Sequence, residues 1–264
     1  MDNWWDESEV ALDETLRWQI GPRTLWITRT EREWKFATTA GSGSPGNEVA
    51  KPADAPEGEG IDTQRFAAQG DSGLLRLAPV SADRHVVVKT RQPFSVPPGA
   101  EATLFMSVPL WYRVYLGGSS TALVDEPIFR PSDTWFGPNT MTGELCYASR
   151  TNARLRLADV PVRPHRAVVV ARIRNSAASP LKVGKLKIPV QHLSLFESEG
   201  ESLWTQALTL ERREDTDDAS VRLDDKPTHI VTAKRVAPPR TRMSKGFLLD
   251  AFGGLFVKKG EPSE

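Results

Sequence analysis

The stretch from residue 129 to residue 151, FRPSDTWFGPNTMTGELCYASRT, contains most of the side chains that could do chemistry. Asp133 and Glu144 could act as paired carboxylates in general acid and base catalysis. Cys146, the only cysteine of the chain, could act as a nucleophile if a histidine from another segment activated it. A lone cysteine in a strand is more often a small residue of the core. The stretch therefore favours a protein without catalytic residues and leaves a hydrolase that uses the 130–150 loop as an alternative.

The rest of the sequence contains no motif of a known reaction. Its four histidines, His85, His165, His192 and His229, do not have the mutual spacing of a metal site. Neither a glycine-rich phosphate loop nor a G-x-S-x-G motif occurs. We therefore expect no metal ion and no organic cofactor.

Turn-forming residues give the same stretch the features of a binding loop. Pro138 fixes φ, Asn139 tolerates the left-handed region and Gly143 can supply a positive φ. A compact loop should therefore precede a strand that begins after Gly143. Trp135 should be a rigid, partly exposed contact residue of this loop. Asp133 can instead hydrogen-bond the backbone of its own turn.

Arginines dominate one face of the strands expected on either side of residues 158–165. A hairpin at this segment, ADVPVRPH, would bring four arginines, Arg154, Arg156, Arg172 and Arg174, onto one sheet surface. Like charges that face each other destabilise a sheet. The cluster therefore needs either ion pairs with acids such as those of residues 211–218, or a carboxylate, a phosphate or an acidic partner segment. The predicted ligand- or partner-binding residues are Asp133, Trp135, Asn139, Glu144, Arg150, Arg154, Arg156, Arg172 and Arg174.

The elements that must position these side chains are strands. Apolar and polar residues alternate through most of the chain, and Gly, Pro, Asn and Asp separate the runs at intervals of about 8 to 12 residues. This pattern is typical of an all-β protein, and we predict an antiparallel β-sandwich architecture with two packed β-units. The tryptophans expected in the core are Trp18, Trp26, Trp34 and Trp111, and the Trp4–Trp5 pair is expected to contact a partner.

Shifts in composition divide the chain into six segments. The residues after position 40 are rich in Gly, Pro and acidic side chains, a composition that favours a flexible loop. The predicted segments are an acidic N-terminal tail (1–14), strands that join the first β-unit (15–40), a flexible loop (41–70), the first β-unit (71–160), the second β-unit (161–233) and a basic tail with a short amphipathic helix (234–264).

The two ends of the chain carry opposite charge. Residues 1–16 contain six acidic residues and no basic residue, whereas residues 234–259 contain seven basic residues and one acidic residue. Within KGFLLDAFGGLFVKKG, large apolar residues recur at the spacing of one helical face. We predict a short helix that docks on a membrane or a partner, with the surface of this protein itself as the alternative. The predicted docking residues are Phe247, Leu248, Phe252, Leu255 and Phe256.

The overall composition limits the partners and the compartment. The chain has 34 basic and 34 acidic residues, so it lacks a global field that would attract nucleic acid. One cysteine cannot form an internal disulfide, the acidic N-terminus differs from a signal peptide, and no apolar run is long enough to span a bilayer. We expect a cytoplasmic protein, with peripheral contact at the inner membrane as an option.

Three segments resemble a family of prokaryotic domains of unknown function. They are FRPSDTWFGPNTMTGELCYASRTNARLRL, RHVVVKTRQPFSVPPGAEATLFMSVPLW and LKIPVQHLSLF, and the first is the most specific. The resemblance extends over most of the chain, from residue 15 to residue 256. Genes of this family often neighbour those of small-conductance mechanosensitive channels, which implies a partner or a regulatory role. The family has no established catalytic residues.

These observations predict a non-catalytic β-sandwich module that binds or regulates a protein. A mechanosensitive channel or its soluble domain is the candidate partner that the resemblance implies. The alternative is a binder of a small anionic ligand, or a hydrolase, that uses the 130–150 loop. The absence of a cofactor motif favours the first.

Overall fold

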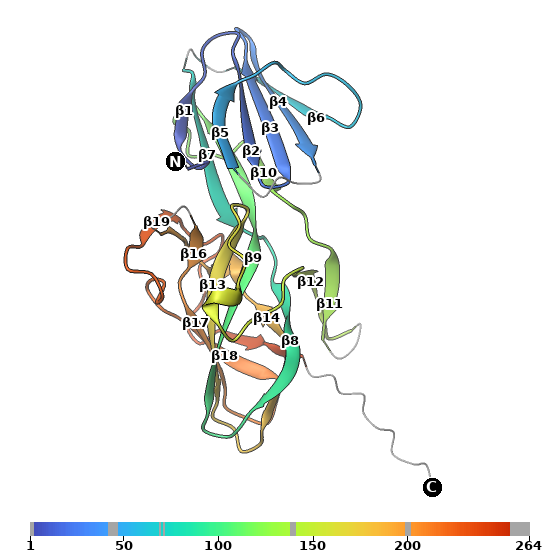
Figure 1. Cartoon of the computed structure of the whole chain (residues 1–264), viewed down its shortest axis with the longest axis vertical. Coiled ribbons are helices and arrows are strands. Elements are labelled where there is room, and N and C mark those ends of the chain that lie inside the picture. The colour runs from blue at the N-terminus through green and yellow to red at the C-terminus, as the bar shows by residue number, and fades with distance from the viewer. Residues whose placement is uncertain are drawn as a thin grey trace.

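A computed structural model shows two β-rich lobes stacked along the long axis of the molecule (Figure 1). It describes residues 3–41, 47–68, 70, 72–137, 141–198 and 202–253. Within these ranges the chain forms 21 β-strands, two 3-10 helices and no α-helix. The prediction of a mainly β chain is therefore confirmed. No helix in the described ranges is long and apolar enough to cross a membrane.

The N-terminal lobe is built on a five-stranded antiparallel sheet with the order β5-β2-β3-β4-β6. Apolar residues alternate with polar ones, so Trp18, Leu25 and Trp34 are buried on one face. This face packs against the neighbouring sheet. The guanidinium group of Arg23 donates a hydrogen bond to the carbonyl oxygen of Pro127 in that sheet (3.1 Å). The strands are β2 (Thr15–Ile20), β3 (Arg23–Arg29), β4 (Glu33–Ala40), β5 (Asn47–Pro52) and β6 (Asp62–Ala67).

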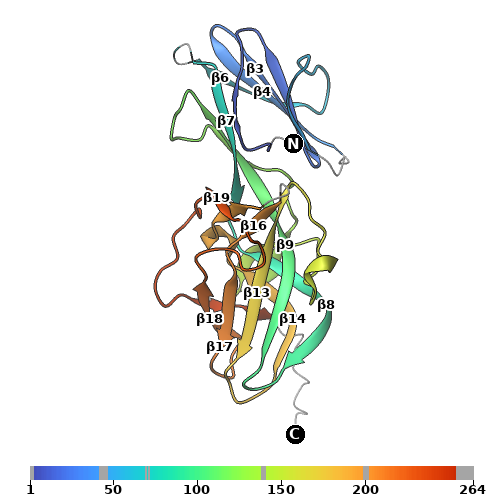
Figure 2. The same cartoon turned by 60° about the vertical axis from the view of Figure 1, so that its left-hand side comes forward.

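An 11-stranded sheet connects the two lobes. Its longest strand, β9, has 16 residues; its second half pairs with β7 and β10, and its first half pairs with β13 in the C-terminal lobe (Figure 2). The strands of this sheet are β1 (Glu7–Glu9), β7 (Leu74–Ser81), β9 (Glu101–Leu116), β10 (Val124–Pro127), β13 (Arg166–Asn175), β15 (Leu195–Glu197), β16 (Leu203–Thr205), β17 (Leu208–Arg212), β18 (Asp218–Leu223), β19 (Lys234–Ala237) and β20 (Leu248–Asp250).

In the C-terminal lobe the strands close into a ring. Pairing runs from β9 through β13, β17 and β18 to β20, and Ala251 then leads the chain into β21, which pairs with β14. β14 pairs with β8, and Ala153 and Arg154 bridge β8 back to β9. The remaining elements are β8 (Val86–Val96), β11 (Asp133–Phe136), β12 (Glu144–Ala148), β14 (Leu181–Ile188), β21 (Phe252–Gly253), η1 (Leu157–Asp159) and η2 (Val190–His192).

One hydrophobic core runs through both lobes. Trp18, Trp34 and Trp111 belong to it, as predicted, whereas Trp26 is only half-buried. The prediction that Trp4 and Trp5 contact a partner is wrong, since both are buried in this core. The pairing of β1 with β7 holds the N-terminal segment against the molecule, and the indole nitrogen of Trp4 donates a hydrogen bond to the carbonyl oxygen of Pro164 (3.2 Å).

The predicted division into segments needs correction at two places. The 41–70 segment contains β5 and β6, because the open edges of β2 and β4 offer backbone partners to a chain whose composition favours a loop. The segments 71–160 and 161–233 are not separate units, because β9 and β13 pair directly along residues 101–109 and 166–174. The boundary between the two lobes therefore crosses β9 and does not fall between two consecutive segments of the chain.

The predicted C-terminal helix does not form in the described part of the chain. Residues 248–253 form β20 and β21, which pair with β18 and β14, so open strand edges prevail over the local helical spacing. Phe252 is buried, Phe247 is half-buried beside the ring of His192, and only Leu248 is exposed. Leu255 and Phe256 lie outside the described residues.

Candidate functional site

Strands β11 and β12 form a hairpin on the side of the C-terminal lobe (Figure 1). Among the strands that the structure describes, only β12 joins the rest of this sheet, through two parallel pairs with β8, so β11 is an edge strand. As predicted, a strand begins directly after Gly143, but it ends at Ala148 and does not continue to residue 157. Asn139 lies outside the described residues.

The inner face of the hairpin forms a small core of its own. Phe136 and Cys146 are fully buried together with Val87 of β8. The ammonium groups of Lys185 and Lys187 each lie 5.1 Å from the centre of the Phe136 ring. At this distance the face of an aromatic ring attracts a cation. Apolar and cation–π contacts thus hold the hairpin against β8 and β14.

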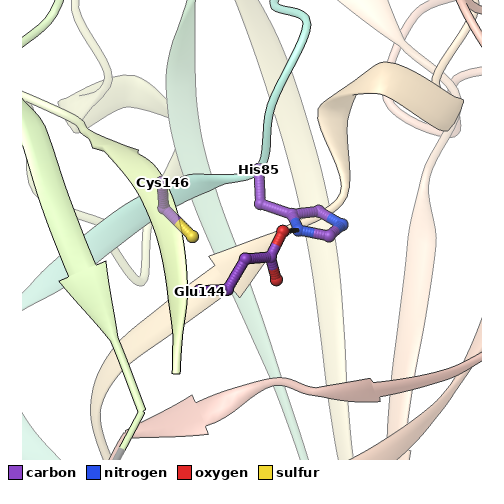
Figure 3. Close-up of side chains that lie close together, drawn as sticks. All are labelled: His85, Glu144 and Cys146. Atoms are coloured by element: carbon purple, nitrogen blue, oxygen red, sulfur yellow. Dashed lines mark hydrogen bonds and ion pairs between the residues drawn. The ribbon is translucent and has the colours of Figure 1, made fainter. Parts of the chain in front are cut away.

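Beside this core, ionisable side chains from three separate segments meet. Figure 3 shows those of two segments, His85 before β8 and Glu144 with Cys146 on β12. The Nζ of Lys187 donates to Oε2 of Glu144 at 3.0 Å, and the Nδ1 of His85 lies 2.5 Å from Oε1. The Sγ of Cys146 is close by, since the ligand atoms of His85, Glu144 and Cys146 all lie within 4.8 Å of one another. Glu144 therefore links the hairpin to β14 and to the residue that precedes β8.

These neighbours fix the protonation of the cluster. The hydrogen bond from His85, and then that from Lys187, lower the pKa of Glu144 to about 2, although partial burial opposes them. Burial, and next the charge of Glu144, raise the pKa of Cys146 to about 11. Because the thiolate is the nucleophilic form, a buried cysteine with this pKa is a poor nucleophile at neutral pH. The geometry brings a histidine to Cys146 but does not activate the thiol.

The pair of carboxylates that the catalytic alternative would require does not form. Asp133 and Glu144 lie on opposite faces of the hairpin, because their pairs, Asp133 with Tyr147 and Glu144 with Phe136, are three positions apart in the ladder and successive pairs alternate between the two faces. The carboxylate of Asp133 instead pairs with the guanidinium of Arg130 at 2.9 Å. Glu144 is occupied by His85 and Lys187, so neither acid is available to the other.

The cluster also offers the donor types of a metal site. An imidazole nitrogen, a thiol and a carboxylate are ligands that Zn²⁺ accepts. The ammonium group of Lys187 works against a cation here, since it is buried and binds the same carboxylate. The donor set could hold a metal only if Lys187 left Glu144, so the arrangement fits an ion-paired anchor better than a metal centre.

The outer face of the hairpin is different in character, since it exposes large apolar side chains. Trp135 and Leu145 are directly opposite each other in the ladder and are 42% and 45% exposed. Met141, at the end of the hairpin loop, is 92% exposed. The indole of Trp135 covers Gly143, where a Cβ atom would lie 2.1 Å from the indole nitrogen. Gly143 is therefore required for space, whereas the left-handed φ of the turn, +148°, belongs to Gly137.

The four arginines predicted to gather on one surface do not gather. The predicted hairpin between them is absent because β9 lies between Arg154 and β13. Arg172 forms an ion pair with Asp224, and Arg174 pairs with Glu101 at 3.1 Å. Arg172 and Arg174 are therefore neutralised by acidic residues of the protein itself, as the alternative to anion binding predicted.

The other three arginines among the predicted binding residues, Arg150, Arg154 and Arg156, have different surroundings. The guanidinium of Arg150 lies 4.2 Å from the centre of the Phe129 ring. Arg154 and Arg156 line a groove beside β8. Sequence reasoning did not point to His85 or Lys187, because no spacing along the chain links them to Glu144. Only the pairing of β8 with β12 and β14 brings these residues together.

Comparison with protein-family profiles gives a match over nearly the whole chain. The sequence profile of a family described as a protein of unknown function (DUF432) matches residues 4–258. No curated protein and no solved structure matches the chain.

Proposed function

The chain belongs to the DUF432 family of proteins of unknown function, and we propose that it is a non-catalytic module that binds a protein partner through the β11–β12 hairpin. The observation that carries this proposal is the exposed pair formed by Trp135 of the edge strand β11 and Leu145 of β12. Large aromatic side chains dominate the binding energy of many interfaces, and exposed apolar groups of this kind mark contact sites.

The construction of the hairpin supports the proposal. Its inner face is anchored by Phe136, by Cys146 and by the ion pair of Glu144 with Lys187. An anchored hairpin presents its outer side chains in a fixed arrangement, which reduces the entropy that a partner must overcome on binding. The open edge of β11 also offers backbone groups to a strand of the partner.

A small-conductance mechanosensitive channel, or its soluble domain, is the first candidate partner. The gene neighbourhood implied by the resemblance of the sequence is the reason for this choice. Peripheral membrane contact through residues 247–256 has less support, since Leu248 is the only exposed docking residue among those that the structure describes. Hydrolysis by the 130–150 loop also has less support, because Cys146 is buried and its pKa is raised.

The proposal can be tested with Leu145→Ala and a matched control. Leu145 is 45% exposed on the hairpin, and Leu123 is 42% exposed in the N-terminal lobe. We expect the purified soluble domain of the channel to bind the wild type and the Leu123→Ala variant alike. Because interface anchors contribute about 1–2 kcal/mol or more, Leu145→Ala and Trp135→Ala should weaken binding about tenfold or more. Titration calorimetry would measure the affinities.

Two results would count against the proposal. Equal affinity of the wild type and both hairpin variants would show that the hairpin is not the contact surface. No binding by the wild type would remove the channel domain as the partner.

A further inference from the structure

A groove opens between two consecutive strands that do not pair with each other. β8 and β9 diverge from the turn that joins them, and each pairs with other strands (Figure 1). Residues 153–154 cross the gap between the two strands. The backbone amide of Ala153 donates a hydrogen bond to the carbonyl oxygen of Lys89, and the backbone amide of Arg154 donates one to the carbonyl oxygen of Phe105, both at 2.8 Å. The groove beside this crossing has a volume of about 460 Å³, which lies within the range of small-molecule sites, roughly 300–1,000 Å³.

An irregularity in β8 shapes one wall of the groove. In the ladder with β14, Lys89 pairs with Lys185 and Phe94 pairs with Val183, so that residues 90–93 are opposite Gly184 alone. Bulges of this kind re-aim side chains and are frequent next to binding sites. Arg91, within the bulge, is exposed at the groove. Register shift and divergence of the strands thus explain why a groove forms here.

Three arginines line the groove without an acidic partner. Arg91 comes from the bulge, and Arg154 and Arg156 come from the segment that crosses the gap. Over the ranges that the structure describes, no ion pair and no side-chain hydrogen bond involves any of the three. The only acid in the described lining is Asp159, which is exposed. Three positive charges against one negative charge leave a net positive groove.

Apolar side chains line the same groove. Leu104 is buried and contributes to the lining from β9, Phe94 is half-buried, and Leu155 is exposed. A site with a few charged groups beside an apolar surface suits a small ligand that has both an anionic and an apolar part. A ligand with charge alone would leave this apolar surface uncovered.

We propose that the groove binds a small organic phosphate, with the guanidinium groups of Arg91, Arg154 and Arg156 on the phosphate and the apolar part against Phe94 and Leu104. Guanidinium groups present a planar fork of N–H donors that matches phosphate oxygens. Three guanidinium groups suit a ligand with two negative charges, such as a phosphate, better than a ligand with a single carboxylate. The proposal goes beyond protein binding by the hairpin and does not depend on it, since it uses none of the hairpin residues.

The test compares two double variants that remove the same charge. Arg154→Ala with Arg156→Ala removes two arginines of the groove, whereas Arg174→Ala with Arg213→Ala removes two exposed arginines that form ion pairs elsewhere. Titration calorimetry with phenyl phosphate should give saturable binding to the wild type and to the control. The groove variant should bind at least about thirtyfold more weakly, since it loses the charge-assisted hydrogen bonds of two guanidinium groups. Circular dichroism would verify that both variants fold.

Further probes identify the source of the phosphate. Inorganic phosphate should bind more weakly than phenyl phosphate if the apolar part of the groove contributes. A lipid headgroup and a free ligand would need the same arginines, so the variants alone cannot distinguish them. Binding to vesicles that contain phosphatidic acid distinguishes the two sources. The proposal is overturned if the wild type binds neither phenyl phosphate nor these vesicles saturably. It is equally overturned if the two double variants lose binding to the same extent, because the loss would then reflect overall charge.

Discussion

At the scale of single residues, Lys187 places the strongest demand on its surroundings. Its side chain is 6% exposed, and a buried ammonium group is costly unless a partner compensates for the lost water. Glu144 at 3.0 Å and the ring of Phe136 at 5.1 Å provide this compensation. Both partners belong to the hairpin, so a hairpin that moved away would leave a charge in an apolar site. The ion pair therefore favours one position of the hairpin.

The ionisation of Glu144 makes this contribution dependent on pH. The pKa is about 2 in the folded protein and about 4.3 in an unfolded chain. The stabilisation is thus fully present above about pH 5 and is lost as the pH falls toward 2. Because the carboxylate side chain is 43% exposed, solvent screening reduces the effect, and we expect about 1 kcal/mol.

The comparison of the wild type with Glu144→Gln tests this expectation. Urea unfolding should show a lower free energy of unfolding for the variant at pH 7. The difference should become smaller at pH 3, because the unfolded wild-type chain binds a proton at Glu144 below about pH 4.3, whereas Glu144 in the folded protein stays largely ionised until the pH nears 2. A difference that stays constant between the two pH values would show that the ionised carboxylate does not stabilise the hairpin.

Part of this site could be predicted from the sequence and part could not. Turn residues and alternation pointed to a partly exposed Trp135, which the structure has 42% exposed. They could not point to His85 and Lys187, because contacts between strands depend on register and not on spacing along the chain. The same limit explains why Arg172 and Arg174 were grouped with Arg154, although each has an acid beside it.

At the scale of elements, β20 and β21 show how the ring of strands closes. Together they span only six residues, yet β20 pairs with β18 and β21 pairs with β14. Leu249, Ala251 and Phe252 are buried in the main core. The spacing of apolar residues suggested a helix, because a short apolar run does not distinguish a helix from a buried strand. The free edges of two strands, which no local pattern reveals, determined the outcome.

Two substitutions within this short segment should differ sharply. Phe252 is 1% exposed and Leu248 is 69% exposed. Phe252→Ala should lower the free energy of unfolding by about 3–5 kcal/mol, as expected for a large aromatic side chain in a core. Leu248→Ala should change it by less than about 0.5 kcal/mol. Chemical denaturation of both variants would measure the difference, and similar values for the two would contradict the placement of β20 and β21.

At the scale of the whole molecule, the alternation of apolar and polar residues predicted strands but not how the strands are divided between the two lobes. Most pairings are between strands far apart in the sequence, such as β9 with β13 and β13 with β17. The sequence therefore indicated a mainly β chain with two units, while the boundary between the units could not be read from composition. β9 belongs to both lobes, since its two halves pair with different strands.

This sharing predicts that the lobes unfold together. The core that contains Ile20 of the N-terminal lobe also contains Ile188 of the C-terminal lobe, and both side chains are fully buried. Melting of either lobe would strip half of β9 of its partners and expose the core of the other. We therefore expect a single unfolding transition in scanning calorimetry, even though two-state behaviour is less common in chains of this size.

A matched pair of core substitutions makes the expectation decisive. Ile20→Ala and Ile188→Ala should each cost about 2–5 kcal/mol, which corresponds to a decrease in Tm of roughly 4–20 °C for a chain of this length. Each variant should still show one transition, shifted as a whole. Two separate transitions, of which Ile20→Ala moved only one and Ile188→Ala moved only the other, would show that the lobes fold independently and that β9 merely connects them.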